Sequence, residues 1–165
     1  MINYTIMKRL ILAVAIIATI CSQSGFAQDN KKESLLASYY DIKNALVSSD
    51  AATASGKAGE FLKGISSTDA KTFSGTADFK SVQAKLSKDA RQIAESKDLA
   101  KQREYFADFS VSFFKLAKAE KLSAAPVYYQ YCPMKKAYWL SASKDVKNPY
   151  YGKQMLTCGR VEETI

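Results

Sequence analysis

The sequence contains no histidine, and this absence excludes several classes of function. Without an imidazole there can be no Ser-His-Asp or Cys-His catalytic site, and the ordinary zinc sites that use histidine ligands are excluded too. The long apolar run, Leu10 to Ile20, has eleven residues, whereas a helix that spans a membrane needs about 20. We therefore expect neither a hydrolase nor a membrane-spanning helix in this chain.

The first 27 residues have the pattern of a secretory signal peptide. Two basic residues precede the apolar run, which is followed by small and polar residues that end in Gly25-Phe-Ala27. We expect cleavage near Ala27 and a mature protein that is periplasmic or secreted. Lipidation of Cys21 is an alternative, but a lipoprotein signal has a small residue before the cysteine, and Ile20 is bulky.

Charge and length limit what the mature chain can be. Removing residues 1–27 takes away two basic and no acidic residues, so the net charge falls from +8 to +6. No Lys/Arg block is dense enough to specify nucleic acid, which we do not expect as a partner. The rest of the chain has the length of one domain with one hydrophobic core.

Residues 28–122 predict a mainly α fold, an up-down four-helix bundle. Apolar side chains recur there every three or four positions, in four segments joined by mostly short connections. The four apolar stripes are Leu35, Tyr39, Ile42 and Leu46; Ala51, Ala54, Ala58, Phe61, Leu62 and Ile65; Phe79, Val82, Leu86 and Ile93; and Phe106, Phe109, Phe113 and Leu116. We interpret the aromatic stripe of the fourth segment as core packing.

The ends of these helices also have sequence signals. Asn30-Lys-Lys-Glu33 has the form of a capping box, so we expect the first helix to begin there. The breaks at Ser48-Ser-Asp50 and Ser96-Lys-Asp98 separate helices, and Asp50 can cap the second one. Residues 66–78 are rich in Ser, Thr, Gly and Asp, which predicts a loop with one helical turn.

Residues 123–165 predict a short extended and irregular segment that packs on the bundle as part of the same domain. Side chains alternate from Val127 to Cys132, and Ala137 to Leu140 can pair with them across a turn at 134–136. Asn148-Pro-Tyr-Tyr-Gly152 has strong turn chemistry. We expect one helical turn at Gln154 to Cys158, which Gly159 ends.

Two cysteine and methionine pairs in this segment predict a soft-metal site. Cys132 and Met134 flank a proline and point the same way if the chain is extended. Met155 and Cys158 share one face if the chain makes a helical turn. Together they would form a closed, all-sulfur set of ligands, which selects Cu(I), with Ag(I) as a chemical analogue.

A disulfide between Cys132 and Cys158 is the alternative interpretation. Two cysteines remain after signal cleavage, and a disulfide is the usual outcome in an oxidising compartment. It would stabilise the fold by about 3 to 4 kcal/mol in the chain-entropy model, and Met134 and Met155 would then fill gaps in the core. A thiol oxidoreductase would usually have Cys-x-x-Cys at a helix start, so we expect no enzyme. The spacing leaves the metal site and the disulfide both open.

A further set of residues extends over most of the mature chain. It comprises Tyr131-Cys-Pro-Met134, Tyr138-Trp-Leu-Ser141, Lys147-Asn-Pro-Tyr-Tyr-Gly152, Met155 and Cys158-Gly159, with Tyr39, Ala45-Leu46, Asp50, Arg103 and Phe106 to Ser110 upstream. This set resembles the signature of a family of exported bacterial domains of unknown function, found alone or joined to periplasmic adaptor subunits of copper- and silver-type efflux pumps. The chain departs from that signature between Met134 and Tyr138, where the family has a longer, glycine-containing insert.

The resemblance implies a periplasmic module that binds Cu(I) or Ag(I), or that assists heavy-metal efflux. The expected metal ligands are Cys132, Met134, Met155 and Cys158. An efflux-pump adaptor or another envelope protein is the expected partner. The alternative function is a non-catalytic interaction domain of the envelope, in which a disulfide braces the tail and exposed tyrosines meet a partner protein or polymer.

Overall fold

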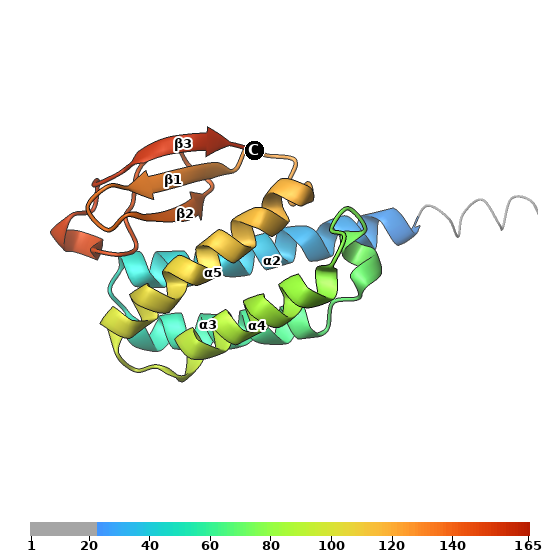
Figure 1. Ribbon diagram of the computed structural model, residues 1–165, viewed down its shortest axis with the longest axis horizontal. Helices are drawn as coiled ribbons and strands as arrows, with labels where there is room; N and C mark the ends of the chain where they lie inside the picture. The colour runs from blue at the N-terminus through green and yellow to red at the C-terminus, as the bar shows by residue number, and fades with distance from the viewer. Residues whose placement is uncertain (1–22) are drawn as a thin grey trace, which may run out of the picture.

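The computed structural model describes residues 23–165, in which four helices precede a three-stranded sheet (Figure 1). In chain order the elements are α2 (Gln23–Val47), α3 (Ala51–Ser66), the 3-10 helix η1 (Ala70–Phe73), α4 (Phe79–Glu95), α5 (Leu99–Ala119), β1 (Tyr128–Cys132), β2 (Ala137–Ser141), the 3-10 helix η2 (Gly152–Gln154) and β3 (Arg160–Thr164). Most of the expected signal peptide, with Cys21, lies outside the described residues.

The elements form three layers. In Figure 1 the sheet lies above α5 and α2, and α3 and α4 lie below them. Each helix contacts the next one along the chain, and β2 contacts both α5 and α2. The predicted helical bundle is therefore confirmed, and the C-terminal segment is more regular than predicted because it forms a sheet.

Aromatic rings fill the centre of the bundle. The Tyr39 ring stacks on Phe113 with 4.8 Å between centroids, and the Phe61 ring meets Phe109 edge-on at 4.8 Å. Phe106, Phe109 and Phe113 are completely buried. Such rings each bury a large apolar area, and their mutual contacts add to it. The interpretation of the fourth stripe as core packing is confirmed.

Within residues 23–165, aspartates cap the helices α3, α4 and α5 at their N-termini. The Asp50 carboxylate accepts a hydrogen bond from the Thr53 N–H at 2.9 Å, so the predicted break and cap are confirmed. Asp78 caps α4 and Asp98 caps α5 in the same way. The carboxylates satisfy first-turn amides that have no partner within the helix. The helical turn expected between residues 66 and 78 is η1.

The predicted start of the first helix was wrong. Helix α2 begins at Gln23, so Asn30 lies inside it and does not form a capping box. No proline interrupts the residues before Asn30. Once a helix is nucleated and anchored by its buried stripe, each added residue extends it at little cost. Among residues 23–165, no helix is long and apolar enough to cross a membrane.

The sheet has the order β2-β1-β3, with both pairs antiparallel. The predicted pairing of the first two strands is confirmed, with Cys132 opposite Ala137 and a turn between them. Strand β3 was not predicted. Its sequence, Arg160-Val-Glu-Glu-Thr164, is mostly charged and exposed, so it lacks the apolar alternation by which strands are recognised.

Two local geometries around the sulfur residues also differ from the prediction. Strand β1 ends at Cys132, so Met134 lies in the turn and not in an extended chain. The helical turn lies earlier than expected, at Gly152–Gln154, and Met155 has already left the helical conformation. Met155 and Cys158 are instead the two ends of a turn closed by the Cys158 N–H, which donates to the Met155 carbonyl at 3.1 Å.

Candidate metal centre

A buried tyrosine fastens the sheet to the bundle. The Tyr39 hydroxyl on α2 accepts a hydrogen bond from the Leu140 N–H of β2 at 3.0 Å and shares another with the Ser110 hydroxyl of α5 at 2.7 Å. Burial raises the pKa of Tyr39 well above its usual value, so the group stays a neutral hydroxyl. One side chain therefore joins two helices to the strand that follows the cysteine turn.

An arginine fixes the turn that precedes η2. The Arg103 guanidinium donates to the Pro149 carbonyl at 2.9 Å, and to the Leu46 carbonyl and the Ser49 hydroxyl at 3.0 Å each. Gly152 has φ of +55°, and a Cβ there would lie 2.6 Å from the Ser49 hydroxyl oxygen. Only glycine fits this close approach in a left-handed conformation. The turn is thereby held against the end of α2.

The connection from β2 to β3, residues 142–159, covers one face of the sheet. The Gln130 side-chain amide donates to the carbonyls of Ser143 and Lys144, at 3.0 Å and 3.2 Å. At the other end of the connection, a Cβ on Gly159 would lie 2.8 Å from the buried Trp139 ring. These contacts bring the chain back to the end of β1, where Cys132 lies.

The two cysteines meet at this point as free thiols. The Cys132 and Cys158 sulfurs are 3.3 Å apart, and they come from the end of β1 and from the residues before β3. Cys132 is completely buried, and Cys158 is partly exposed. The structure therefore brings together the two cysteines that sequence analysis selected as candidate ligands.

Hydrogen-bond donors around the sulfurs make the two thiols unequal. Burial alone would raise the pKa of Cys132, but hydrogen bonds from the Lys135 N–H, the Cys158 thiol, the Asn148 side chain and the Met134 N–H outweigh it and hold this pKa below its usual value. The Lys135 nitrogen is 3.4 Å from the Cys132 sulfur. The hydrogen bond shared with Cys132 raises the pKa of Cys158, as does burial. Cys132 is thus the first of the pair to become a thiolate.

Asn148 organises the other side of the pair. Its amide nitrogen donates to the Cys158 carbonyl at 2.7 Å, and its amide oxygen accepts from the Tyr150 N–H at 2.8 Å. The residue is completely buried. Sequence analysis identified Asn148 only as a turn residue and missed its role beside the sulfurs. Its place after a charged, turn-rich stretch gave no signal that it would return to the end of β1.

The two methionines flank the thiol pair and are open to solvent. Met134 is 64% exposed and Met155 is 37% exposed. Neither fills a gap in the core, so that part of the disulfide interpretation was wrong. The Met134 N–H donates to the sulfurs of the pair, and its side chain lies on a turn that solvent reaches.

The donors at this site fit a soft ion better than a hard one. In the part of the chain that the structure describes, no three side chains of His, Cys, Asp or Glu gather at one point. The side-chain donors that the structure brings together here are the two cysteine sulfurs, and Met134 and Met155 are their neighbours in the sequence. Thiolate and thioether are ligands that Cu(I) prefers, whereas zinc usually takes four Cys or Cys with His.

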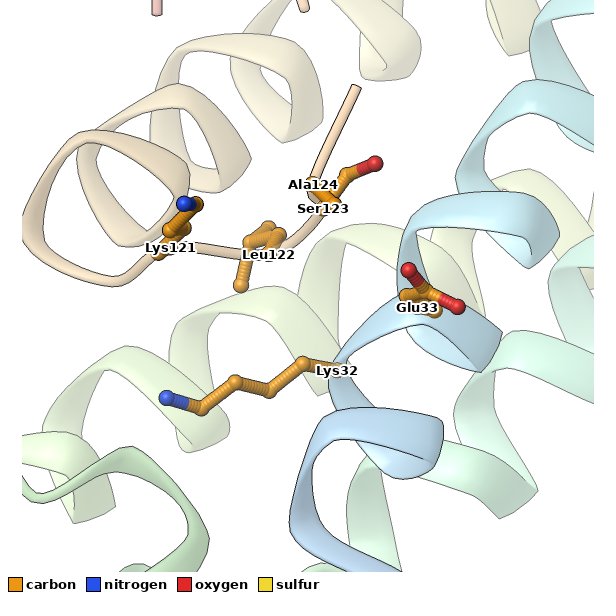
Figure 2. A pocket seen from close by; sticks show the side chains of 6 residues that line it. All are labelled: Lys32, Glu33, Lys121, Leu122, Ser123 and Ala124. Atoms are coloured by element: carbon orange, nitrogen blue, oxygen red, sulfur yellow. The ribbon is translucent and has the colours of Figure 1, made fainter. Parts of the chain in front are cut away.

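A separate hollow of about 280 Å³ lies between Lys32 and Glu33 of α2 and the connection from α5 to β1 (Figure 2). Figure 2 shows Lys32 extending from α2 toward the connection that carries Lys121 and Leu122. The Lys32 ammonium already pairs with the Glu120 carboxylate at 2.8 Å. None of the residues that line this hollow is one of the two cysteines or a hydrogen-bond partner of their sulfurs, so the hollow is not part of the thiol site.

A comparison with family models matches residues 35–124 to the family described as "Protein of unknown function (DUF3347)". The matched residues run from α2 to the connection after α5, so both cysteines lie beyond them. No curated protein and no solved structure matches the chain.

Proposed function

This chain belongs to the DUF3347 family, and we propose that it acts as a periplasmic module that binds Cu(I) or Ag(I) and assists heavy-metal efflux. Cys132 and Cys158 supply the thiolates, and Met134 and Met155 supply thioethers. The observation that carries the proposal is the meeting of two free thiols, 3.3 Å apart, at the junction of two turns that each carry a solvent-exposed methionine. A soft monovalent ion is the cation that such donors select.

Exposure of the methionines supports binding that is accessible to a partner. Met134 is 64% exposed and gains little from packing, while Met155, at 37% exposed, is packed on one side and open on the other. As ligands they would close the outer side of the site, while the buried Cys132 and its amide donors form the inner side. A metal held in this way can be passed to another sulfur site on a partner such as an efflux-pump adaptor.

The inequality of the thiols argues against an oxidoreductase. The thiol whose pKa is lowered, Cys132, is completely buried, whereas the more accessible Cys158 has a raised pKa. A disulfide oxidoreductase needs its low-pKa thiolate exposed to the substrate. The lowered pKa of Cys132 instead favours a ligand that is ready to bind a cation.

Cu(I) titration against a competing chelator, under reducing conditions, tests the proposal. We expect about one Cu(I) per chain, because four soft donors complete one coordination sphere. Affinity should fall most in Cys132→Ser and Cys158→Ser, and less in Met134→Leu/Met155→Leu. It should also fall as the pH drops, because protons compete for the thiolates.

A matched control comes from Leu156, which at 37% is as exposed as Met155 but has no sulfur. The Leu156→Ala variant should bind Cu(I) like the wild type. Equal affinity in the wild type and the double methionine variant would remove the methionines from the site. No uptake by the reduced wild type would refute the metal function altogether.

The second candidate is a non-catalytic envelope interaction domain that a disulfide braces. It is favoured by the same short distance between the Cys132 and Cys158 sulfurs, because two thiols in contact can be oxidised to a disulfide in an oxidising compartment. A count of free thiols on protein purified from the exported fraction, with and without reductant, separates the two. Two free thiols without reductant support the metal site, and none supports the brace.

A further inference from the structure

A second polar hollow lies between α2 and the connection that follows β2. Its volume is about 250 Å³, below the roughly 300 to 1,000 Å³ typical of sites for drug-sized ligands. It is lined by Tyr40, Lys43, Asn44, Ser141, Ala142, Ser143, Asp145 and Lys147. None of these residues belongs to the thiol site, so the hollow needs a separate explanation.

Lys43 is the unusual residue in this lining. It is only 6% exposed, and among the described residues its ammonium has neither a hydrogen bond nor an ion pair. Lysine is almost never buried without a partner, because the charge loses its hydration. Burial lowers the pKa of Lys43 to about 8, and repulsion from Lys147 contributes to the shift. Two lysines therefore line one hollow.

The Tyr40 hydroxyl is a second hydrogen-bond donor in the hollow that has no partner among the described residues. The Tyr40 oxygen is buried and has no hydrogen-bond partner within residues 23–165. Burial raises the pKa of Tyr40 well above its usual value, so the group keeps its proton and can donate it. A buried donor without a partner is costly, so an occupant that accepts its hydrogen bond would remove the cost.

The charges in the lining favour an anion. Lys43 and Lys147 carry positive charge, while Asp145 is exposed and forms no ion pair with either lysine. A cation would meet two like charges and gain one carboxylate. An anion would meet two opposite charges, with the Tyr40 hydroxyl as a donor and Asp145 as the one opposing charge.

We propose that this hollow binds a small oxyanion, the carboxylate or phosphate group of a small molecule, which pairs with Lys43 and Lys147 and accepts a hydrogen bond from Tyr40. Lys43 is the central ligand because it is the buried one. Charge-assisted hydrogen bonds of this kind are stronger than those between neutral groups. The volume of the hollow limits the occupant to a small group, such as the end of a metabolite or polymer. The proposal does not depend on the sulfur site.

Calorimetric titration with inorganic phosphate in one arm and succinate in the other tests the proposal, with chloride holding the ionic strength constant. We expect saturable binding of one anion per chain in at least one arm, and the stronger arm identifies the headgroup. Lys43→Met should weaken that binding roughly tenfold or more, as expected when a hydrogen bond to a charged group is lost. Lys147→Met and Tyr40→Phe should weaken it less, and Asp145→Asn should strengthen it.

The exposed Lys101 of α5, which does not line the hollow, provides the control for lost positive charge. Lys101→Met should bind like the wild type. Binding should also weaken as the pH rises through about 8, where Lys43 loses its proton. The other ionisable groups that line the hollow are Tyr40 on α2 and Asp145 and Lys147 on the connection.

Two results would overturn the proposal. One is the absence of saturable binding of both anions to the wild type. The other is an equal affinity in the wild type and in Lys43→Met, with circular dichroism showing that the variant is folded. Misfolding of Lys43→Met is not expected, because the change removes a buried charge and keeps a side chain of similar length. Tyr40→Phe supplies a second variant that loses one atom only.

Discussion

The helical bundle and the C-terminal segment of this protein share one hydrophobic core, but different interactions fix the path of the backbone in each. In the bundle, rings and aliphatic side chains from four helices fill the core, where the Phe113 ring contacts both Tyr39 and Phe61. In the C-terminal segment, single polar side chains such as Asn148 and Gln130 fix the path of the backbone through carbonyl and amide groups. The first kind of packing tolerates many sequences, whereas the second requires particular residues at particular positions.

This difference decides where a candidate site can be placed precisely. Apolar packing is not directional, so the bundle supplies a stable platform. Hydrogen bonds are directional, so the C-terminal segment can bring Cys132 and Cys158 to 3.3 Å from distant parts of the chain. Tyr39 and Arg103 join the two parts because each is anchored in the bundle and donates to, or accepts from, the C-terminal backbone.

The largest effect is expected in the bundle core. Phe113→Ala should lower the free energy of unfolding by about 3 to 5 kcal/mol, because it removes a buried ring and leaves a cavity. Urea unfolding followed by far-ultraviolet circular dichroism measures the change. Val111→Ala, at a 39% exposed position of the same helix, should change stability by less than about 0.5 kcal/mol. Similar values for both variants would mean that the aromatic stripe is not the core.

The next effect has the opposite sign, because Lys43 is a buried lysine with no ion-pair partner among the described residues. Its pKa is about 8 in the folded protein and 10.5 in the unfolded chain, so the unfolded state binds more protons between these values. Stability should therefore rise with pH across this window, and the penalty is complete below pH 8. At pH 7, Lys43→Met should stabilise the protein by on the order of 3 kcal/mol, from the size of the pKa shift.

The advantage of Lys43→Met over the wild type should disappear above pH 10.5, the pKa of the unfolded chain. Urea unfolding at a series of pH values, in a buffer free of phosphate and carboxylates, measures it. The exposed Lys101→Met variant should show no such change with pH. If the free energies of unfolding of the wild type and Lys43→Met differ by the same amount at every pH, Lys43 is not held in an unfavourable charged state.

The bundle was predictable from the sequence because its signals are local. The three- and four-residue spacing of apolar side chains located the helices, and Asp50 and Asp98 located their breaks. The start of α2 was not predictable in this way. Extension of the helix on the N-terminal side of Asn30 depends on how the rest of the helix is anchored and not on a cap. Cys132 and Cys158 were selected by type and compartment, and the structure placed them together.

The part of the candidate site that could not be predicted from the sequence depends on contacts between residues far apart in the chain. Asn148 acts through the Cys158 carbonyl, and the amides of Met134 and Lys135 act through a turn whose shape depends on β1 pairing with β2. The hollow around Lys43 is formed only when the connection after β2 lies against α2. No spacing rule along the chain encodes such meetings, because each depends on how the sheet docks on the bundle.

Asn148→Ala tests whether polar contacts in the C-terminal segment hold the thiol pair as the rings hold the bundle. The change leaves the Cys158 carbonyl and the Tyr150 N–H without their partner, which should cost about 1 to 3 kcal/mol. It also removes one of the hydrogen bonds that lower the pKa of Cys132. The ultraviolet absorbance of the thiolate, titrated in a Cys158→Ser background, should therefore shift to higher pH. Asn30→Ala, the same substitution at an exposed position of α2, should change neither stability nor titration. An unchanged thiolate titration in Asn148→Ala would show that the backbone amides alone stabilise the Cys132 thiolate. The thiol pair would then be held by the main chain of the turn and not by a polar side chain.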